Sequence, residues 1–252
     1  MPAKPLRGLR VLVPRGGKWG DSTAAALRMA GATPVIAPMI NFASADDGVE
    51  LANALHELQD GQFDWIVITS ATTVDVFVGH GVSIPESTKV VAVGETTSAA
   101  LALANYRVDF APTDNSPRGL VARWRELKVT GRVLVPQSDI PEPTLVSGLA
   151  ELELDVQFVA VYRTVGIPVS DAICADVASG RIGAILVSSG SVARQIADQL
   201  TPLPSTTVVA CIGPRTAFDA RAVGITVDVI ADERSSDSLV AALVEHVGAQ
   251  RG

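Results

Sequence analysis

The stretch Val208-Val209-Ala210-Cys211-Ile212-Gly213-Pro214-Arg215-Thr216-Ala217-Phe218 predicts a buried strand, a turn and the first residues of a helix. The apolar run is short and ends at a turn, as expected for an inner strand of a parallel sheet. Gly213 lets the backbone turn sharply, and Pro214 suits the first helical position, where a missing N–H donor costs nothing. Open α/β sheets bind anions at such loops, where the carboxyl end of a strand leads into a helix.

This strand–turn–helix pattern occurs twice, because residues 66–126 align without gaps to residues 185–245. The identities cluster at the turns, where Ser70 pairs with Ser189, Gly94 with Gly213 and Thr97 with Thr216. A second match relates residues 10–14 to residues 132–136, since both read Arg-Val-Leu-Val-Pro. The repeat predicts two related α/β halves. We expect them to place two sets of helix N-termini across one cleft.

The run from Val156 to Val165 is longer than a routine strand of a small sheet, which predicts a strand that crosses between the halves. In the repeat it matches the segment near Ile40. We therefore expect two linker strands, near 37–41 and 162–167. They would separate a discontinuous domain, residues 1–37 plus 167–252, from a continuous domain, residues 41–162.

Composition and charge argue against several classes of protein. Of the 252 residues, 48% are hydrophobic and 4% aromatic, which suits helices packed on a parallel sheet. The net charge of −7 argues against nucleic acid as a partner, because that partner needs a clustered basic face. With no recognisable signal peptide and no apolar run of transmembrane length, we expect a soluble cytoplasmic protein without a membrane partner. Cys174 and Cys211 are expected to be buried, reduced thiols.

The sequence lacks the motifs of common cofactor sites. The three histidines, His56, His80 and His246, lie far in sequence from one another and from the cysteines, so no metal site is expected. No Gly-x-Gly-x-x-Gly follows a strand, which disfavours a dinucleotide site. No Gly-x-Ser-x-Gly elbow or other nucleophile–base pair is recognisable. We therefore expect no cofactor and no covalent catalysis.

The predicted turns carry hydroxyls, glycines and a few arginines, a set that binds oxyanions. The candidate binding residues are Arg15, Thr69, Ser70, Gly94, Thr97, Ser138, Ser188, Ser189, Gly213, Pro214, Arg215 and Thr216. Simpler interpretations stay open, since Ser70 can be only a helix cap and Arg15 only part of a solvated turn. That turn precedes a helix predicted from about 21 to 30, with Asp21 or Ser22 as its cap. The residues alone predict a multi-anionic small molecule bound between two domains.

Six short motifs follow one another in a specific order and spacing. They are residues 11–15 (VLVPR), 65–70 (WIVITS), 92–97 (AVGETT), 133–139 (VLVPQSD), 160–164 (AVYRT) and 210–216 (ACIGPRT). Together, in a duplicated α/β chain, they make the protein resemble the uroporphyrinogen-III synthase family over essentially its full length. The sequence departs from the family pattern at Gln137, where a basic residue is more usual, and in the Gly16-Gly17 turn.

The resemblance implies two similar flavodoxin-like parallel-sheet domains joined by a two-stranded linker, with the substrate between them and no cofactor or metal. It implies a lyase of porphyrin and heme biosynthesis that acts as a monomer. Its substrate would be hydroxymethylbilane, a linear tetrapyrrole with many carboxylates. The reaction would close this chain to uroporphyrinogen III, with loss of water and inversion of the terminal pyrrole ring.

The resemblance also implies roles for individual residues. Tyr162 matches the tyrosine that is the best candidate to assist departure of the hydroxyl, although it could simply pack a linker strand on one domain. Thr97 and Thr216 match threonines that line the cleft. Ser70 and Ser189 match serines in turns that contact substrate acid groups, largely through backbone amides.

Two other functions remain open at this point. The chain could be a synthase-like module that binds a tetrapyrrole without turning it over and regulates a partner. A two-domain solute receptor is also conceivable, although the lack of a recognisable signal peptide disfavours it.

Overall fold

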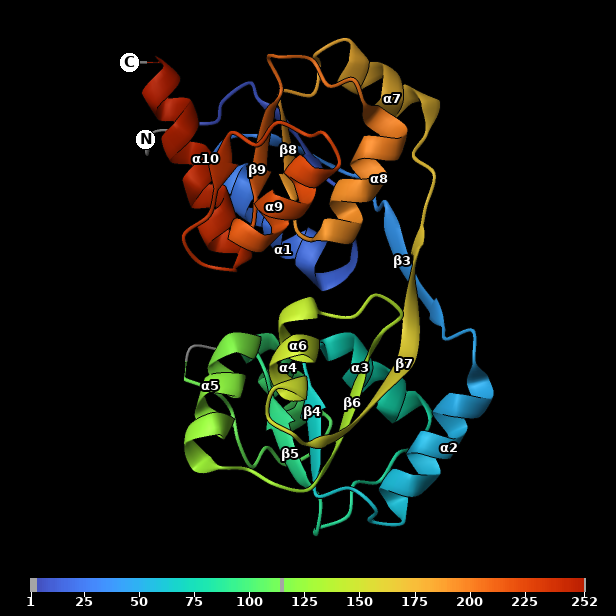
Figure 1. Ribbon diagram of the computed structural model, residues 1–252. Helices are drawn as coiled ribbons and strands as arrows, with labels where there is room; N and C mark the ends of the chain where they lie inside the picture. The colour runs from blue at the N-terminus through green and yellow to red at the C-terminus, as the bar shows by residue number, and fades with distance from the viewer. Residues whose placement is uncertain (1–3, 114–115, 252) are drawn as a thin grey trace. The chain divides into compact units, whose positions relative to one another are not determined.

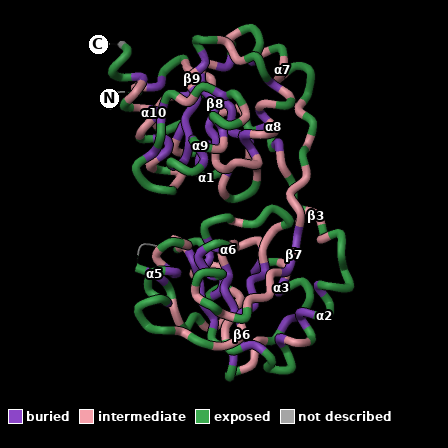
Figure 2. The backbone as a smooth tube through the Cα atoms, viewed as in Figure 1, coloured by how far each residue is buried: buried purple, intermediate pink, exposed green. Residues whose placement is uncertain are grey.

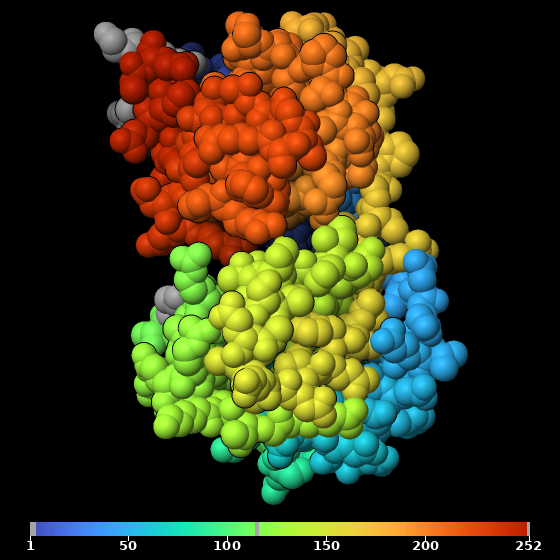
Figure 3. All heavy atoms as spheres, in the orientation of Figure 1, coloured from blue at the N-terminus to red at the C-terminus, as the bar shows by residue number. Residues whose placement is uncertain are grey.

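The computed structural model describes residues 4–113 and 116–251. No signal peptide is recognisable in the sequence of the N-terminal segment, and the first residues of that segment, 1–3, lie outside the described residues. The chain divides into two compact units, one made of residues 1–41 and 165–252 (unit 1) and one of residues 42–164 (unit 2). Figure 3, coloured along the chain, shows orange and red atoms in unit 1 and green and cyan atoms in unit 2.

Unit 1 is built on a five-stranded sheet with the order β10-β9-β8-β1-β2. Its strands are β1 (Arg10–Val13), β2 (Thr33–Ile36), β8 (Ala184–Val187), β9 (Val208–Cys211) and β10 (Val229–Ile230). Every neighbouring pair is parallel. Taken in chain order, this is the 2-1-3-4-5 arrangement of the flavodoxin-like fold.

Helices cover both faces of this sheet because its strands are apolar on both sides (Figure 1). On one face, Val11 and Val13 pack with α1 (Gly17–Met29) and α10 (Ser236–Arg251). On the other, Leu12 and Ile185 pack with α7 (Asp171–Ala178), α8 (Gly190–Leu200) and α9 (Pro214–Ala222). Neighbouring residues along a strand therefore pack on opposite faces of the sheet. Figure 2 shows the strands buried between exposed helix surfaces.

Unit 2 repeats this plan with the sheet order β3-β7-β6-β4-β5. Its strands are β3 (Ile40–Ser44), β4 (Trp65–Ile68), β5 (Lys89–Ala92), β6 (Arg132–Ser138) and β7 (Asp155–Gly166). One face packs against α2 (Gly48–Gln59), α3 (Ala71–Gly79) and α4 (Glu95–Leu103), and the other against α5 (Pro117–Leu127) and α6 (Pro143–Ala150). The chain passes between the units within β3 and within β7. The expected α/β fold with two mostly parallel sheets is confirmed.

Residues that match in the internal repeat also have matching partners in the two sheets. In unit 2, Trp65 lies opposite Lys89, and in unit 1 the matching residue Ala184 lies opposite Val208. Beyond β5, unit 2 has a single parallel bridge between Val91 and Phe110 at the place where unit 1 has β10. Four strands of each unit therefore occupy matching places, β7-β6-β4-β5 in unit 2 and β2-β1-β8-β9 in unit 1, although the segments follow one another differently along the chain.

The predicted start of the first helix is wrong. Helix α1 begins at Gly17, so Asp21 and Ser22 lie inside it rather than at its cap. Gly17 has a φ of +64°, a conformation that favours glycine, and the Gly20 N–H donates to the Gly16 carbonyl. The Gly16-Gly17 turn starts the helix through its backbone, without a side-chain cap.

No helix within residues 4–113 and 116–251 combines the length and apolar character needed to cross a membrane. Both cysteines are free thiols, with Cys211 buried in β9 and Cys174 half-buried in α7.

Native protein is expected to leave Cys211 unmodified by a thiol reagent at pH 8, because burial raises the pKa of its thiol to about 12. The thiolate is the reactive form, so both low exposure and low ionisation protect it. Mass spectrometry of peptides after alkylation, with and without denaturant, measures this. Equal labelling of Cys211 under both conditions would contradict the packing described for β9.

Candidate functional site

The predicted binding residues lie mostly where the strands of each sheet end and the next helix begins. In unit 2, β4 leads through Thr69 and Ser70 into α3, and β5 leads through Gly94 into α4. In unit 1, β8 leads through Ser188 and Ser189 into α8, and β9 leads through Gly213 into α9. Each unit thus gathers helix N-termini at the carboxyl edge of its sheet, where free N–H groups attract anions.

Tyr162 and Ser70 are in direct contact in unit 2. The Tyr162 hydroxyl donates to Ser70 Oγ at 3.1 Å, and the Tyr162 side chain is only 8% exposed. The ring of Phe42 meets the Tyr162 ring edge-on, with centroids 5.3 Å apart. Tyr162 is therefore held by two residues far from it in sequence, through a hydrogen bond to Ser70 and a ring contact with Phe42.

Ser70 has two roles in this arrangement. Its Oγ accepts from the backbone N–H of Thr72 at 3.1 Å, so it caps α3 as the simpler interpretation expected. The same oxygen receives the Tyr162 hydroxyl. Capping fixes the Ser70 side chain, and the fixed side chain in turn orients the phenol.

The backbone around Tyr162 is held by the loop after β6. Ser138 lies opposite Tyr162 in the β6–β7 ladder, next to a register shift between Gln137 and Ser138. The Asp139 N–H donates to the Tyr162 carbonyl at 3.0 Å, and the Thr164 N–H donates to Asp139 Oδ1 at 3.1 Å. Ser138 itself forms a local turn, with Oγ bonded to the backbone of Ile140.

Sequence reasoning missed Asp139 and Phe42 as partners of Tyr162. Asp139 belongs to the motif at residues 133–139, which was a usable signal. Phe42 gave none, because an aromatic residue in an extended segment is ordinary. Thr73, in the first turn of α3, was also missed; its Oγ1 is buried and finds no hydrogen-bond partner among the residues that the structure describes.

The turn after β5 is built around Gly94. This residue has φ +102° and ψ 143°, which L side chains rarely adopt, and it precedes α4 without a side-chain cap. Its carbonyl accepts from the N–H and the hydroxyl of Ser98. Thr97 is only 3% exposed, so its side chain is buried beneath the Gly94 turn. The first backbone amides of α4 lie at the carboxyl edge of the sheet.

The equivalent edge of unit 1 has a similar composition. Ser189 Oγ accepts from the Val192 N–H at 3.3 Å and caps α8. Ser188 Oγ is buried, and within the described chain no group bonds to it. Gly213 and Pro214 open α9, and Thr216 is 4% exposed.

The two candidate arginines differ in how they are held. Arg215 Nε donates to Asp219 Oδ1 at 3.1 Å, and its guanidinium lies over the Phe218 ring, so it is drawn onto its own helix. Arg15 lies over the ring of Trp19, 5.7 Å from the ring centre. Arg215 must therefore exchange an ion pair before it can meet an acidic ligand.

Hydroxyls and backbone amides recur at both edges. Among the residues that the structure describes, no group of three or more histidine, cysteine, aspartate or glutamate residues is placed to hold a metal ion. The arrangement can bind carboxylates and can hold a phenol next to a reacting group.

A family model described as uroporphyrinogen-III synthase HemD matches residues 21–241 of this chain. The chain belongs to the uroporphyrinogen-III synthase family. It is 26% identical over 251 residues to the porphyrin biosynthesis protein HemD of Ruminiclostridium josui, covering 96% of this chain and 49% of the relative. It is 25% identical over 142 residues to the uroporphyrinogen-III synthase of Synechococcus elongatus, covering 54% of this chain and 53% of the relative. The chain spans about half the length of the curated relatives it matches.

Solved structures of the family share the fold. A mutant uroporphyrinogen III synthase from the extremely thermophilic bacterium Thermus thermophilus has a TM-score of 0.66 at 17% identity, covering 97% of this chain and 100% of that one. Uroporphyrinogen-III synthetase from Helicobacter pylori has a TM-score of 0.63 at 14% identity, covering 94% and 98%. The resemblance inferred from the six motifs is confirmed at the level of family and fold.

Proposed function

We propose that this chain is a uroporphyrinogen-III synthase, a lyase that cyclises hydroxymethylbilane to uroporphyrinogen III. The observation that carries the proposal is the half-buried Tyr162–Ser70 hydrogen bond at the N-terminus of α3, in a chain of this family. A phenol held in place beside helix N-termini suits a reaction that needs one proton donor and several carboxylate contacts.

The proposed reaction requires one proton donor and a substrate held in a fixed position. The C–O bond of the terminal hydroxymethyl group breaks, with help from the electron pair of the adjacent pyrrole nitrogen. The oxygen leaves as water after taking a proton from the Tyr162 hydroxyl. The resulting carbon then bonds to the substituted α-carbon of the last ring, which the binding site selects by holding the chain in position. The older bond from that α-carbon to its methylene bridge breaks, and the methylene carbon bonds instead to the free α-carbon of the same ring, which inverts the ring. The proton displaced from that α-carbon returns to the Tyr162 phenolate, so that the net loss is one water.

The carboxylates of the substrate are proposed to bind the amides that open the helices. In unit 2 these are the amides after Ser70 and Gly94, and in unit 1 those after Ser189 and Gly213, with Ser188 Oγ as a further donor. Thr69, Thr97, Ser138 and Thr216 shape these edges, and Arg15 and Arg215 add positive charge. The net charge of −7 does not oppose this, because backbone dipoles act locally.

We further propose that the protein works in the cytoplasm as a monomer, without a cofactor or a metal. Sedimentation at several protein concentrations tests the monomer, and unchanged activity after chelator treatment tests the lack of a metal.

Turnover separates the proposed enzyme from a tetrapyrrole-binding module. Purified protein is mixed with a large excess of freshly prepared hydroxymethylbilane, and loss of substrate is followed against a protein-free control. An enzyme removes many equivalents of substrate at a rate proportional to its own concentration. A regulatory module would protect at most one equivalent per chain, and that result would replace the synthase proposal.

A further inference from the structure

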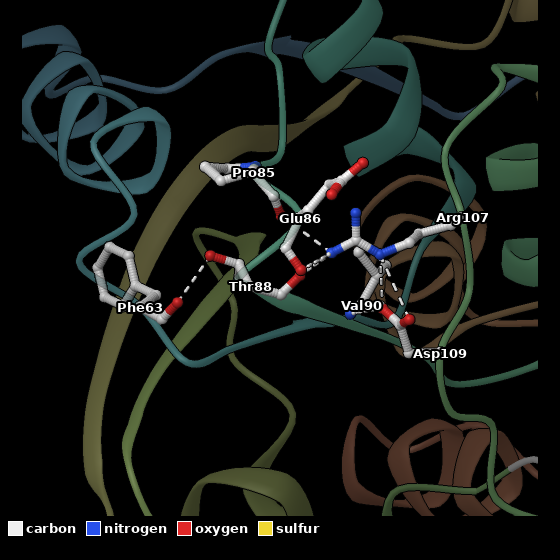
Figure 4. A network of polar contacts seen from close by, with 7 residues as sticks. All are labelled: Phe63, Pro85, Glu86, Thr88, Val90, Arg107 and Asp109. Atoms are coloured by element: carbon white, nitrogen blue, oxygen red, sulfur yellow. Dashed lines mark hydrogen bonds and ion pairs between the residues drawn. The ribbon is translucent and has the colours of Figure 1, made fainter.

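The opposite edge of the sheets, at the amino ends of the strands, carries a second candidate site. In unit 2 this edge holds the guanidinium of Arg107 (Figure 4). Its Nη2 donates to the carbonyls of Pro85 at 2.9 Å and Glu86 at 3.0 Å, and also to the carbonyl of Thr88. Its Nε contacts Asp109 Oδ2 at 3.0 Å. Three carbonyls and one carboxylate thus form a receptor for one guanidinium.

Unit 1 contains the same receptor in its matching segment. The alignment pairs Pro85 with Pro204, Thr88 with Thr207, and Asp109 with Asp228. Glu86 pairs with Ser205, which changes the side chain but keeps the carbonyl that unit 2 uses.

The hydrogen bonds that shape the receptor are also repeated. Val90 N–H donates to Asp109 Oδ2 at 2.7 Å, and Val209 N–H donates to Asp228 Oδ2 at 2.8 Å. Two further bonds are repeated. The Thr88 N–H donates to the Pro85 carbonyl in unit 2, and the Thr207 N–H donates to the Pro204 carbonyl in unit 1. The Thr88 hydroxyl donates to the Phe63 carbonyl, and the Thr207 hydroxyl donates to the Ile182 carbonyl. The loop and the carboxylate are therefore held alike in the two units.

One substitution separates the two receptors. The residue that matches Arg107 is Thr226, whose side chain is too short to reach the carbonyls. A cavity of about 620 Å³ lies here, lined by Pro204, Ser205, Thr207, Thr226 and Asp228 among others. In the described part of the chain, Asp228 has no ion-pair partner, whereas its counterpart Asp109 pairs with Arg107.

We propose that this cavity of unit 1 binds the guanidinium of an alkyl guanidinium ligand, as free arginine or as an arginine side chain of another protein. The ligand repeats the contacts of Arg107: its guanidinium bonds the carbonyls of Pro204, Ser205 and Thr207 and pairs with Asp228, and its alkyl chain lies near Thr226. A planar guanidinium fits this set of acceptors better than an ammonium, because its donors have a fixed, forked arrangement.

The site is independent of the proposed synthase chemistry. It lies at the amino ends of β9 and β10, whereas Ser189 and Gly213 follow the carboxyl ends of β8 and β9. Asp228 is exposed, so solvent screens the ion pair and we expect a dissociation constant of about 1 mM.

The test is a titration of ¹⁵N-labelled protein with argininamide at constant ionic strength. The amide signals of Thr207, Val209 and Asp228 are expected to shift with saturation, and tetramethylammonium at the same concentrations is expected to leave them in place. Equal shifts with both cations, or shifts spread over the whole surface, would overturn the proposal. A tripeptide with a central arginine forms a second arm: tighter binding of argininamide indicates a free metabolite, and tighter binding of the peptide indicates a protein partner.

Three variants sharpen the titration. Asp228→Asn should weaken argininamide binding at least tenfold, and Thr226→Arg should abolish it by supplying the guanidinium from the chain itself. Arg107→Thr should create a second site, seen as new saturable shifts at Thr88 and Val90. If Asp228→Asn binds as tightly as the unchanged protein, or if Thr226→Arg still binds, the cavity is not a guanidinium receptor.

Discussion

Replacing Tyr162 by phenylalanine is expected to lower the kcat for uroporphyrinogen III formation by about 100-fold, the usual contribution of a positioned proton donor. The change removes only the hydroxyl that bonds to Ser70, and the ring keeps its contact with Phe42. The stability of the fold should therefore fall by no more than about 1 kcal/mol, the net value of one hydrogen bond. Initial rates and thermal unfolding of the variant measure the two effects.

The chain provides a matched control in its other tyrosine. Tyr106 also lies in unit 2, and its hydroxyl donates to the Val82 carbonyl at 2.7 Å, in a loop after α4. Tyr106→Phe removes a similar hydrogen bond and should leave kcat unchanged. Equal losses of kcat in both variants would assign the effect of Tyr162→Phe to stability and clear Tyr162 of a role in proton transfer.

The two matched glycines at the carboxyl edges are expected to respond differently to alanine. Gly94 has φ +102°, so Gly94→Ala forces a strained backbone and should cost about 1–3 kcal/mol of unfolding free energy. Gly213 has φ 173°, an extended conformation open to any residue, and an added Cβ would meet only the flexible side chain of Arg234 at 3.3 Å. Gly213→Ala should therefore be much milder.

Denaturant unfolding of both variants tests this asymmetry. A cost of the stated size moves the unfolding midpoint of Gly94→Ala clearly below that of Gly213→Ala. Space plays little part at Gly94, because the nearest atom to an added Cβ is Thr97 Oγ1 at 3.9 Å. Equal unfolding free energies for the two variants would show that the φ of Gly94 is not a requirement of the turn.

Most of the fold could be predicted because the determining signals are local. Short apolar runs such as those of β4 and β8 are apolar on both faces, which is typical of a parallel sheet with helices on both sides. The repeat fixed which segments correspond, and the register of Trp65 with Lys89 and of Ala184 with Val208 agrees with it. The start of α1 was misjudged because Asp21 and Ser22 look like caps, whereas a glycine backbone starts that helix.

The candidate site could be predicted less fully, because it depends on contacts between distant residues. Ser70 and Tyr162 were each singled out, but nothing local indicates that their hydroxyls meet. The ion pair of Arg215 with Asp219 depends on a side-chain conformation that spacing only permits. The difference between Arg107 and Thr226 was visible in the alignment, but its consequence, a cavity with the acceptors kept in place, appears only in three dimensions.

The most direct test of the account is the isomer composition of the product. Hydroxymethylbilane is incubated with catalytic amounts of the protein, the porphyrinogens are oxidised, and the type I and type III uroporphyrins are separated chromatographically. The account predicts mainly the type III isomer, because the protein directs closure to the substituted carbon of the last ring. A product equal to that of the protein-free control, with closure lacking ring inversion, would contradict it.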